Sequence, residues 1–100
     1  MDDIRTWKFS NSVKPEQVSE CLEQLSLIGP GTTLKLDLSE TTDIHSNFIG
    51  FLIHARNHMQ KTGGKLTLII SFTIEKILIM LNIWDYFSPD ISTALSRKSA

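Results

Sequence analysis

Leu34-Lys35-Leu36-Asp37-Leu38-Ser39-Glu40-Thr41-Thr42-Asp43-Ile44-His45-Ser46-Asn47-Phe48-Ile49-Gly50 is the stretch that decides the fold. Three leucines alternate with polar residues over 34–38, which predicts a strand with one buried face. A polar turn follows over 39–43, and the apolar residues 48–60 predict a helix. The first backbone N–H groups of a helix have no partner and favour negative charge. Residues 45–47 are therefore the first place to look for a functional site.

The elements on either side of this stretch alternate in type. They are a strand over 4–10, a helix from Pro15 to Ile28 that stops at Gly29, an apolar strand over 66–72, a helix capped by Thr73, and an aromatic closing turn over 83–87. This alternation predicts an α/β fold with a small, mostly parallel or mixed sheet and its helices packed on one face. Sites in such sheets lie beyond the carboxyl ends of the strands, which again indicates residues 39–47.

The composition favours one compact domain over residues 1–100. The chain has 41% hydrophobic residues, so we expect an ordered core over about 4–88, with 92–100 as a flexible tail. Its single cysteine, Cys21, cannot form an internal disulfide and is expected to be a small core residue. A net charge of −1 does not indicate the basic surface that binding of nucleic acid requires. No signal peptide is recognised and the apolar runs are shorter than the roughly 18 residues of a spanning helix, so we expect a cytoplasmic protein that is not inserted in a membrane.

Two arrangements of histidine residues could in principle carry chemistry. His54 and His58 have the spacing of two metal ligands on a helix, but no third ligand stands at a recognisable spacing. His45 and Ser46 resemble a base beside a nucleophile, yet adjacent side chains seldom align, and Asp43 is the only local acid that could orient the histidine. We therefore expect no metal, no cofactor and no enzymatic activity. Ser46 or Asn47 is expected to cap the helix.

The second and third predicted helices carry more apolar residues than one face needs. The runs are Phe48-Ile49, Phe51-Leu52-Ile53 and 77–81. Either the domain covers both sides of these helices, or some of the side chains meet a partner. We favour a partner surface.

The central stretch resembles the signature of STAS domains, the family of anti-sigma-factor antagonists and of related domains in sulfate transporters. The similar residues are Leu36-Asp37-Leu38-Ser39, Thr42 to Gly50, the Gly63-Gly64 pair before a strand, and the closing segment 81–87. The resemblance covers about residues 32–88, and the family's N-terminal hairpin is shortened here to one strand. It implies the STAS fold.

The resemblance also implies a function. Family members are not enzymes but switches, in which a Ser or Thr is phosphorylated by an anti-sigma factor with kinase activity. The unphosphorylated form binds that kinase and frees a sigma factor. A phosphate at the helix N-terminus adds about −1.5 to −2 charges, which is enough to block a fitted surface.

This sequence departs from the family pattern at the switch itself. His45 replaces the family Asp, Ser46 is kept, Asn47 stands at the phosphoacceptor position, and Phe48 replaces a Gly. Asn cannot accept phosphate, so Ser46 is the candidate displaced acceptor. The predicted partner surface comprises Asp43, His45, Ser46, Asn47, Phe48, Ile49 and Phe51.

These residues lead to two functional hypotheses. The first is a non-catalytic protein-binding module that resembles an anti-sigma-factor antagonist, acts in partner-switching regulation of transcription and binds an anti-sigma factor or serine kinase. The alternative is a constitutive structural STAS subunit of a larger complex, such as a transporter assembly. The missing acceptor favours the alternative, and the isolated domain favours the first.

Overall fold

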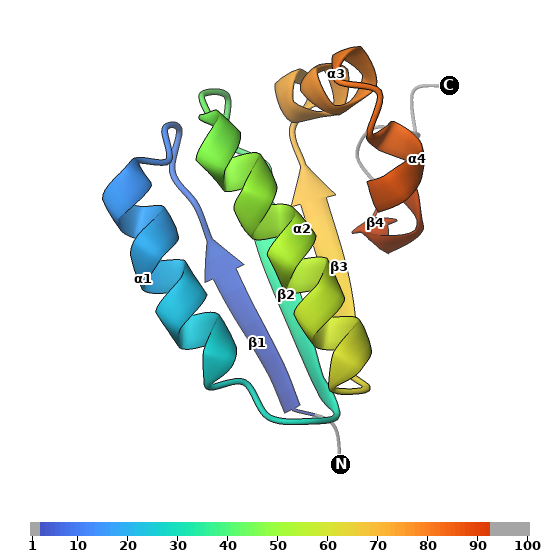
Figure 1. Cartoon of the computed structure of the whole chain (residues 1–100). Helices are drawn as coiled ribbons and strands as arrows, with labels where there is room; N and C mark the ends of the chain where they lie inside the picture. The colour runs from blue at the N-terminus through green and yellow to red at the C-terminus, as the bar shows by residue number, and fades with distance from the viewer. Residues whose placement is uncertain (1–2, 93–100) are drawn as a thin grey trace.

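The structure, a computed structural model, describes residues 3–92. The elements are β1 (Asp3–Lys8), α1 (Pro15–Ser26), β2 (Thr32–Leu38), α2 (Ser46–Lys61), β3 (Lys65–Ile70), α3 (Phe72–Met80), α4 (Trp84–Phe87), the 3₁₀ helix η1 (Ser88–Asp90) and β4 (Ile91–Ser92). The strands form one sheet in the order β1-β2-β3-β4, and each neighbouring pair is parallel. Helices α1 and α2 lie side by side on one face of this sheet (Figure 1). The expected small α/β domain is confirmed.

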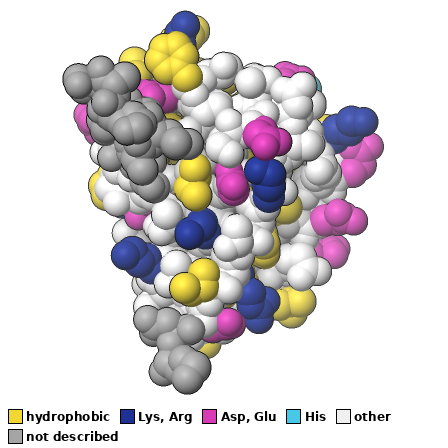
Figure 2. Space-filling model, turned by 180° about the vertical axis from the view of Figure 1, so that it is seen from behind, with side chains coloured by type: hydrophobic (Ala, Val, Ile, Leu, Met, Phe, Trp, Pro, Cys, Tyr) yellow, Lys and Arg dark blue, Asp and Glu magenta, His cyan; other side chains and the backbone are white. Residues whose placement is uncertain are grey.

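Strand β2 is central and sets the two faces of the sheet. Its residues Leu34, Leu36 and Leu38 are fully buried toward the helices, while Lys35 and Asp37 are half-buried on the opposite face. That opposite face carries interspersed acidic and basic side chains (Figure 2). The alternation over 34–38 therefore reports one apolar and one polar sheet face, as expected for a strand covered on one side.

Helix α2 forms the centre of the helical layer. It buries Phe48, Phe51, Leu52, Ala55 and Met59. The helix ends at Thr62, and Gly63 follows with φ +75°, a conformation that glycine adopts without strain. Gly64 then brings the chain so close to β2 that a Cβ there would lie 2.4 Å from the Thr32 carbonyl oxygen.

Helix α3 begins earlier than the sequence predicts. Strand β3 ends at Ile70, and Ser71 is the N-cap, its hydroxyl accepting a hydrogen bond from Ile74 N at 3.1 Å. The expected cap at Thr73 is therefore wrong, because Thr73 already lies inside the helix. Phe72, expected to end the strand, is the first residue of the helix.

The closing segment returns to the sheet. Phe87 is fully buried, and Ile91 pairs with Leu68 of β3. An ion pair between Arg56 of α2 and Asp90 of η1, at 3.0 Å, fixes this segment to the helical layer. Order thus extends beyond residue 88, through Ser92 in β4. The remainder of the predicted flexible tail, residues 93–100, lies outside the described residues.

Candidate functional site

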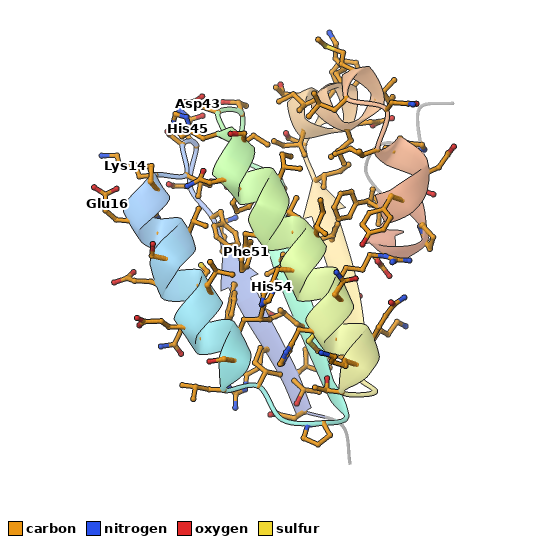
Figure 3. All side chains as sticks on the ribbon, viewed as in Figure 1. Lys14, Glu16, Asp43, His45, Phe51 and His54 are labelled. Carbon is orange, nitrogen blue, oxygen red and sulfur yellow. The ribbon has the colours of Figure 1, made fainter. Side chains whose placement is uncertain are left out.

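The loops that follow β1, β2 and β3 gather at one end of the molecule, where the carboxyl ends of these parallel strands meet. Asp43 and His45 lie at this end, beside the first turn of α2 (Figure 3). The topology thus places the predicted site where parallel sheets usually build one.

A buried threonine holds the loop between β2 and α2. Thr41 is fully buried, and its hydroxyl donates to the Ser10 carbonyl oxygen at 2.8 Å. The Thr41 carbonyl oxygen accepts a hydrogen bond from the Ser71 hydroxyl at 2.6 Å. One residue therefore connects the loops after all three long strands. The sequence alone indicates only a polar turn at Thr41, because the partners of Thr41 are about thirty positions away.

Asp43 belongs to the same framework. Its carboxylate accepts a hydrogen bond from the Ser12 hydroxyl at 3.1 Å, and its carbonyl oxygen accepts one from Val13 N at 3.2 Å. These bonds join the loop before α2 to the loop before α1. Asp43 therefore positions the loop, and its carboxylate is engaged with Ser12.

The first turn of α2 presents polar residues to solvent. His45 is the N-cap, with extended backbone, and its carbonyl oxygen accepts a hydrogen bond from Phe48 N at 2.9 Å. The expected cap at Ser46 or Asn47 is wrong, because both residues lie inside the helix. His45, Ser46 and Asn47 are all exposed. The first turn carries no acidic residue, so no negative side chain within this turn compensates the positive end of the helix dipole.

Phe48 and Phe51 are core residues and do not belong to this surface. Phe48 is 0% and Phe51 1% exposed. The Phe48 ring packs edge-on against Phe9, with centroids 5.4 Å apart, and Phe51 stacks on Trp7 at 6.5 Å. Both were expected at a partner surface, and burial corrects that assignment. Ile49 is half-buried against the core, which leaves Asp43, His45, Ser46 and Asn47 as the exposed candidates.

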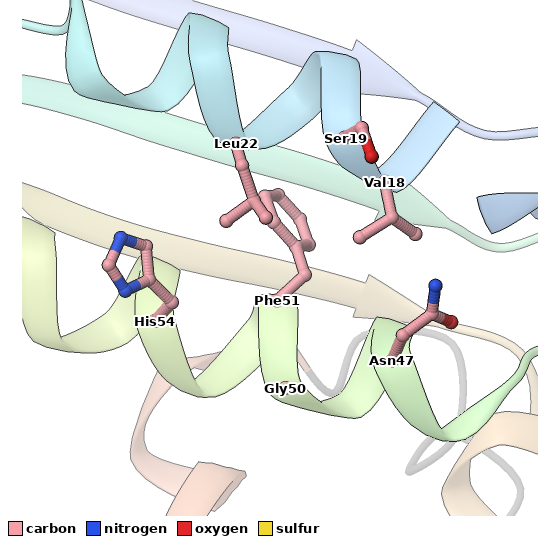
Figure 4. A pocket seen from close by; sticks show the side chains of 7 residues that line it. All are labelled: Val18, Ser19, Leu22, Asn47, Gly50, Phe51 and His54. Atoms are coloured by element: carbon pink, nitrogen blue, oxygen red, sulfur yellow. The ribbon is translucent and has the colours of Figure 1, made fainter. Parts of the chain in front are cut away.

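A groove between α1 and α2 starts at this surface. It has a volume of about 590 Å³ and is lined by Val18, Ser19, Leu22, Asn47, Gly50, Phe51 and His54 (Figure 4). Asn47 stands at one end of this set of residues and His54 at the other. The sequence alone does not assign α1 to the site, because no local pattern indicates which helix lies beside α2.

The two histidines of α2 point to different surroundings. His54 is exposed at the groove, whereas His58 is half-buried with its Nε2 atom 3.4 Å from the Ile28 carbonyl oxygen. Within residues 3–92, no three His, Cys, Asp or Glu side chains are grouped as a metal site would need. The absence of a metal or cofactor stays a prediction.

Asp37 anchors the start of the β2–α2 loop. Its carboxylate accepts hydrogen bonds from the Ser39 hydroxyl at 2.7 Å and from Ser39 N at 3.0 Å. These bonds lower the pKa of Asp37, and the nearby Lys8 ammonium, 3.7 Å away, lowers it further. The Asp-Leu-Ser segment of the family-like signature is thus a hydrogen-bonded turn.

No protein-family model matches the sequence, and no curated protein matches it either. Among residues 3–92, no helix combines the length and the apolar character that crossing a membrane requires.

Proposed function

We propose that this chain is a non-catalytic protein-binding module of the STAS type, and that it binds its partner through the exposed residues Asp43, His45, Ser46 and Asn47. The observation that carries the proposal is the exposed, polar first turn of α2. The bonds of Thr41 and Asp43 hold this turn in place, and it opens onto the groove beside α1. A preformed polar surface next to a partly apolar groove suits a protein partner, because little ordering is needed on binding.

A binding role fits the side chains better than catalysis does. His45 and Ser46 are adjacent and exposed, while the Asp43 carboxylate is turned to Ser12. A nucleophile and base need a mutual hydrogen bond and a third group that orients the base. The exposed side chains of this turn therefore suit recognition of a partner better than a catalytic set of nucleophile, base and orienting acid.

The proposed regulation is partner switching. Ser46 lies exposed in the first turn of α2, where a phosphate would meet unpaired backbone N–H groups. Such a phosphate adds about −1.5 to −2 charges on the surface that the partner would contact. The expected partner is an anti-sigma factor with serine kinase activity, and the regulated output is transcription.

Site-specific photocrosslinking in the source cells tests the surface. A photoreactive residue replaces Asn47 in one variant and Leu27, which is 76% exposed at the C-terminal end of α1, in the control. We expect a specific adduct from position 47 and none from position 27. Equal adducts, or none from position 47, would contradict binding at this surface.

Phosphopeptide mapping of the captured complex then decides between the two functional hypotheses. Phosphate on Ser46, lost in Ser46→Ala, together with a kinase partner, is the expected result. In addition, Asn47→Ser restores an acceptor at the family position and should be phosphorylated by the same kinase. A phosphate-free chain held permanently by a partner without kinase activity would establish the alternative, a constitutive structural subunit of a larger complex such as a transporter assembly.

A further inference from the structure

Helix α3 exposes more large apolar side chains than any other element in the described part of the chain. Phe72 is 70%, Ile79 54% and Met80 81% exposed, and the C-cap residue Leu81 is 53% exposed. On the other side of the helix, Ile74 and Leu78 are fully buried. Hydrophobic side chains protrude at the end of the molecule that carries α3 (Figure 2). The helix is therefore apolar on two sides, and within residues 3–92 the fold covers only one of them.

The exposed residues form one continuous row, which we call the α3 stripe: Phe72, Lys76, Ile79 and Met80. At about 100° per residue these four positions lie within roughly 100° of the circumference of the helix, which is one face. Lys76 lies within the row, with its ammonium 5.3 Å from the centroid of the Phe72 ring. Taking roughly 150–200 Å² per fully exposed large side chain, the stripe and Leu81 present about 450 Å² of apolar surface.

We propose that the α3 stripe pairs with the α3 stripe of a second copy of this chain, in an antiparallel two-fold dimer. The stripe is self-complementary because its aromatic ring lies at the helix N-terminus and its thioether near the C-terminus. Antiparallel pairing centred on Lys76 brings Phe72 of one copy against Met80 of the other, twice. Sulfur–aromatic contacts of this kind are favourable, and a two-fold interface repeats each contact by symmetry.

The available area limits how strong this dimer can be. Two copies, each with its stripe and Leu81, offer at most about 900 Å² of apolar surface, which is at the small end for specific interfaces and typical of weak, reversible association. We therefore expect a weak dimer with a dissociation constant on the order of 100 µM, and not a permanent one.

Electrostatics gives the dimer a second property. The two Lys76 residues flank the two-fold axis, but each ammonium leans over its own Phe72 ring and so away from the axis. The remaining like-charge repulsion is screened by salt. Association should consequently strengthen with ionic strength, which is the opposite of an interface held by ion pairs.

Sedimentation velocity of the purified full chain tests the proposal, from about 5 µM to about 1 mM, a range that brackets a weak interface. The weight-average mass should rise from 11.3 kDa toward twice that value. The double variant Phe72→Ser/Met80→Ser should stay monomeric, while the equally exposed control Leu27→Ser keeps the wild-type curve. Circular dichroism melts confirm that these surface variants remain folded. A wild-type chain that stays at 11.3 kDa overturns the proposal, and so does a double variant that still dimerises.

Disulfide trapping tests the antiparallel register. In a Cys21→Ser background, three samples are oxidised: the variant Phe72→Cys alone, the variant Met80→Cys alone, and an equimolar mixture of the two. The mixture should give a 72–80 crosslinked dimer at least about tenfold faster than either variant alone, because the register places these positions opposite each other. Equal rates in all three samples would overturn the register. This inference does not depend on the proposed function, whose test reads adducts at position 47.

Discussion

Replacing Phe48 and, in a separate variant, the exposed Phe72 by alanine decides between two positions for the Phe48 ring. The structure places Phe48 in the core, whereas the sequence suggests that Phe48 lies at a partner surface. Phe48→Ala removes a ring that is 0% exposed, whereas Phe72→Ala removes one that is 70% exposed. The two variants lose the same atoms, so composition and the unfolded chain change alike. Any difference in the free energy of unfolding then reports the environment of each ring.

The expected magnitude follows from what each ring contacts. Phe48 packs against Phe9 at 5.4 Å and Phe51 at 5.7 Å, so its loss leaves a cavity between two aromatic neighbours. Truncation of a buried phenylalanine costs about 3–5 kcal/mol. The exposed ring of Phe72 should change stability by no more than about 0.5 kcal/mol. A domain of this size has about 5–15 kcal/mol in total, so Phe48→Ala removes a large share of it.

Urea denaturation followed by circular dichroism measures the difference. With a slope of about 2 kcal/mol per molar urea, the midpoint of Phe48→Ala should fall by about 2 M, and that of Phe72→Ala should hardly move. Samples at low micromolar concentration keep self-association out of the measurement. If Phe48→Ala does not fold, Phe48→Leu supplies a milder loss at the same position. A loss below about 1 kcal/mol for Phe48→Ala, or equal losses for the two alanine variants, would refute the core assignment.

Three further predictions concern the framework of the site. Gly64→Ala should cost at least about 2 kcal/mol in urea melts, because the added Cβ would lie 2.4 Å from the Thr32 carbonyl oxygen; an unchanged midpoint would contradict this approach. The pKa of Asp37 is lowered in the folded protein, first of all by the hydrogen bond from the Ser39 hydroxyl. The ionised Asp37 carboxylate therefore stabilises the fold above the pKa of this group in the unfolded chain, and the stabilisation is lost as the pH falls through the pKa of the folded state. Wild type should therefore exceed Asp37→Asn in stability at pH 7 and converge with it in acid, whereas a pH-independent gap would exclude this linkage. Asp90→Asn breaks the half-buried ion pair that fixes η1 to α2 and should speed amide hydrogen exchange in α4 and η1 more than in β2, a contrast that uniform exchange would contradict.

The sequence predicted the layer arrangement well, because its strongest signals are local. Alternation over 34–38 and the run over 66–70 identify two strands whose apolar residues face the same core. The same reasoning failed where two elements share one apolar run. The apolar pattern of residues 66–72 does not show where the strand ends, and it predicts Phe72 in the strand although Phe72 begins α3. Ser71, a good cap inside that run, was the signal that could have corrected it.

The candidate site was located by topology, but its composition depended on distant contacts. The rule that sites follow the carboxyl ends of parallel strands gave residues 39–47 without any structure. The bonds that hold this loop join residues 30 or 31 positions apart, as in Thr41 to Ser10 and Ser71 to Thr41. Polar turn residues of this kind have no sequence pattern that names their partners. The groove beside α1 was missed for the same reason.

The apolar excess of α2 and α3 looks alike in sequence, yet it has two different outcomes. Helix α2 has α1 on one side, the sheet below it, and the closing segment held by the Arg56–Asp90 ion pair on the other side. Three neighbours absorb its large side chains, so Phe48 and Phe51 need no partner. Helix α3 lies beyond the end of β3, where only its Ile74–Leu78 side meets the core. The position of a helix within its layer, and not its composition, therefore decides whether an apolar excess becomes core or stays exposed, and within residues 3–92 α3 is left with an exposed apolar face.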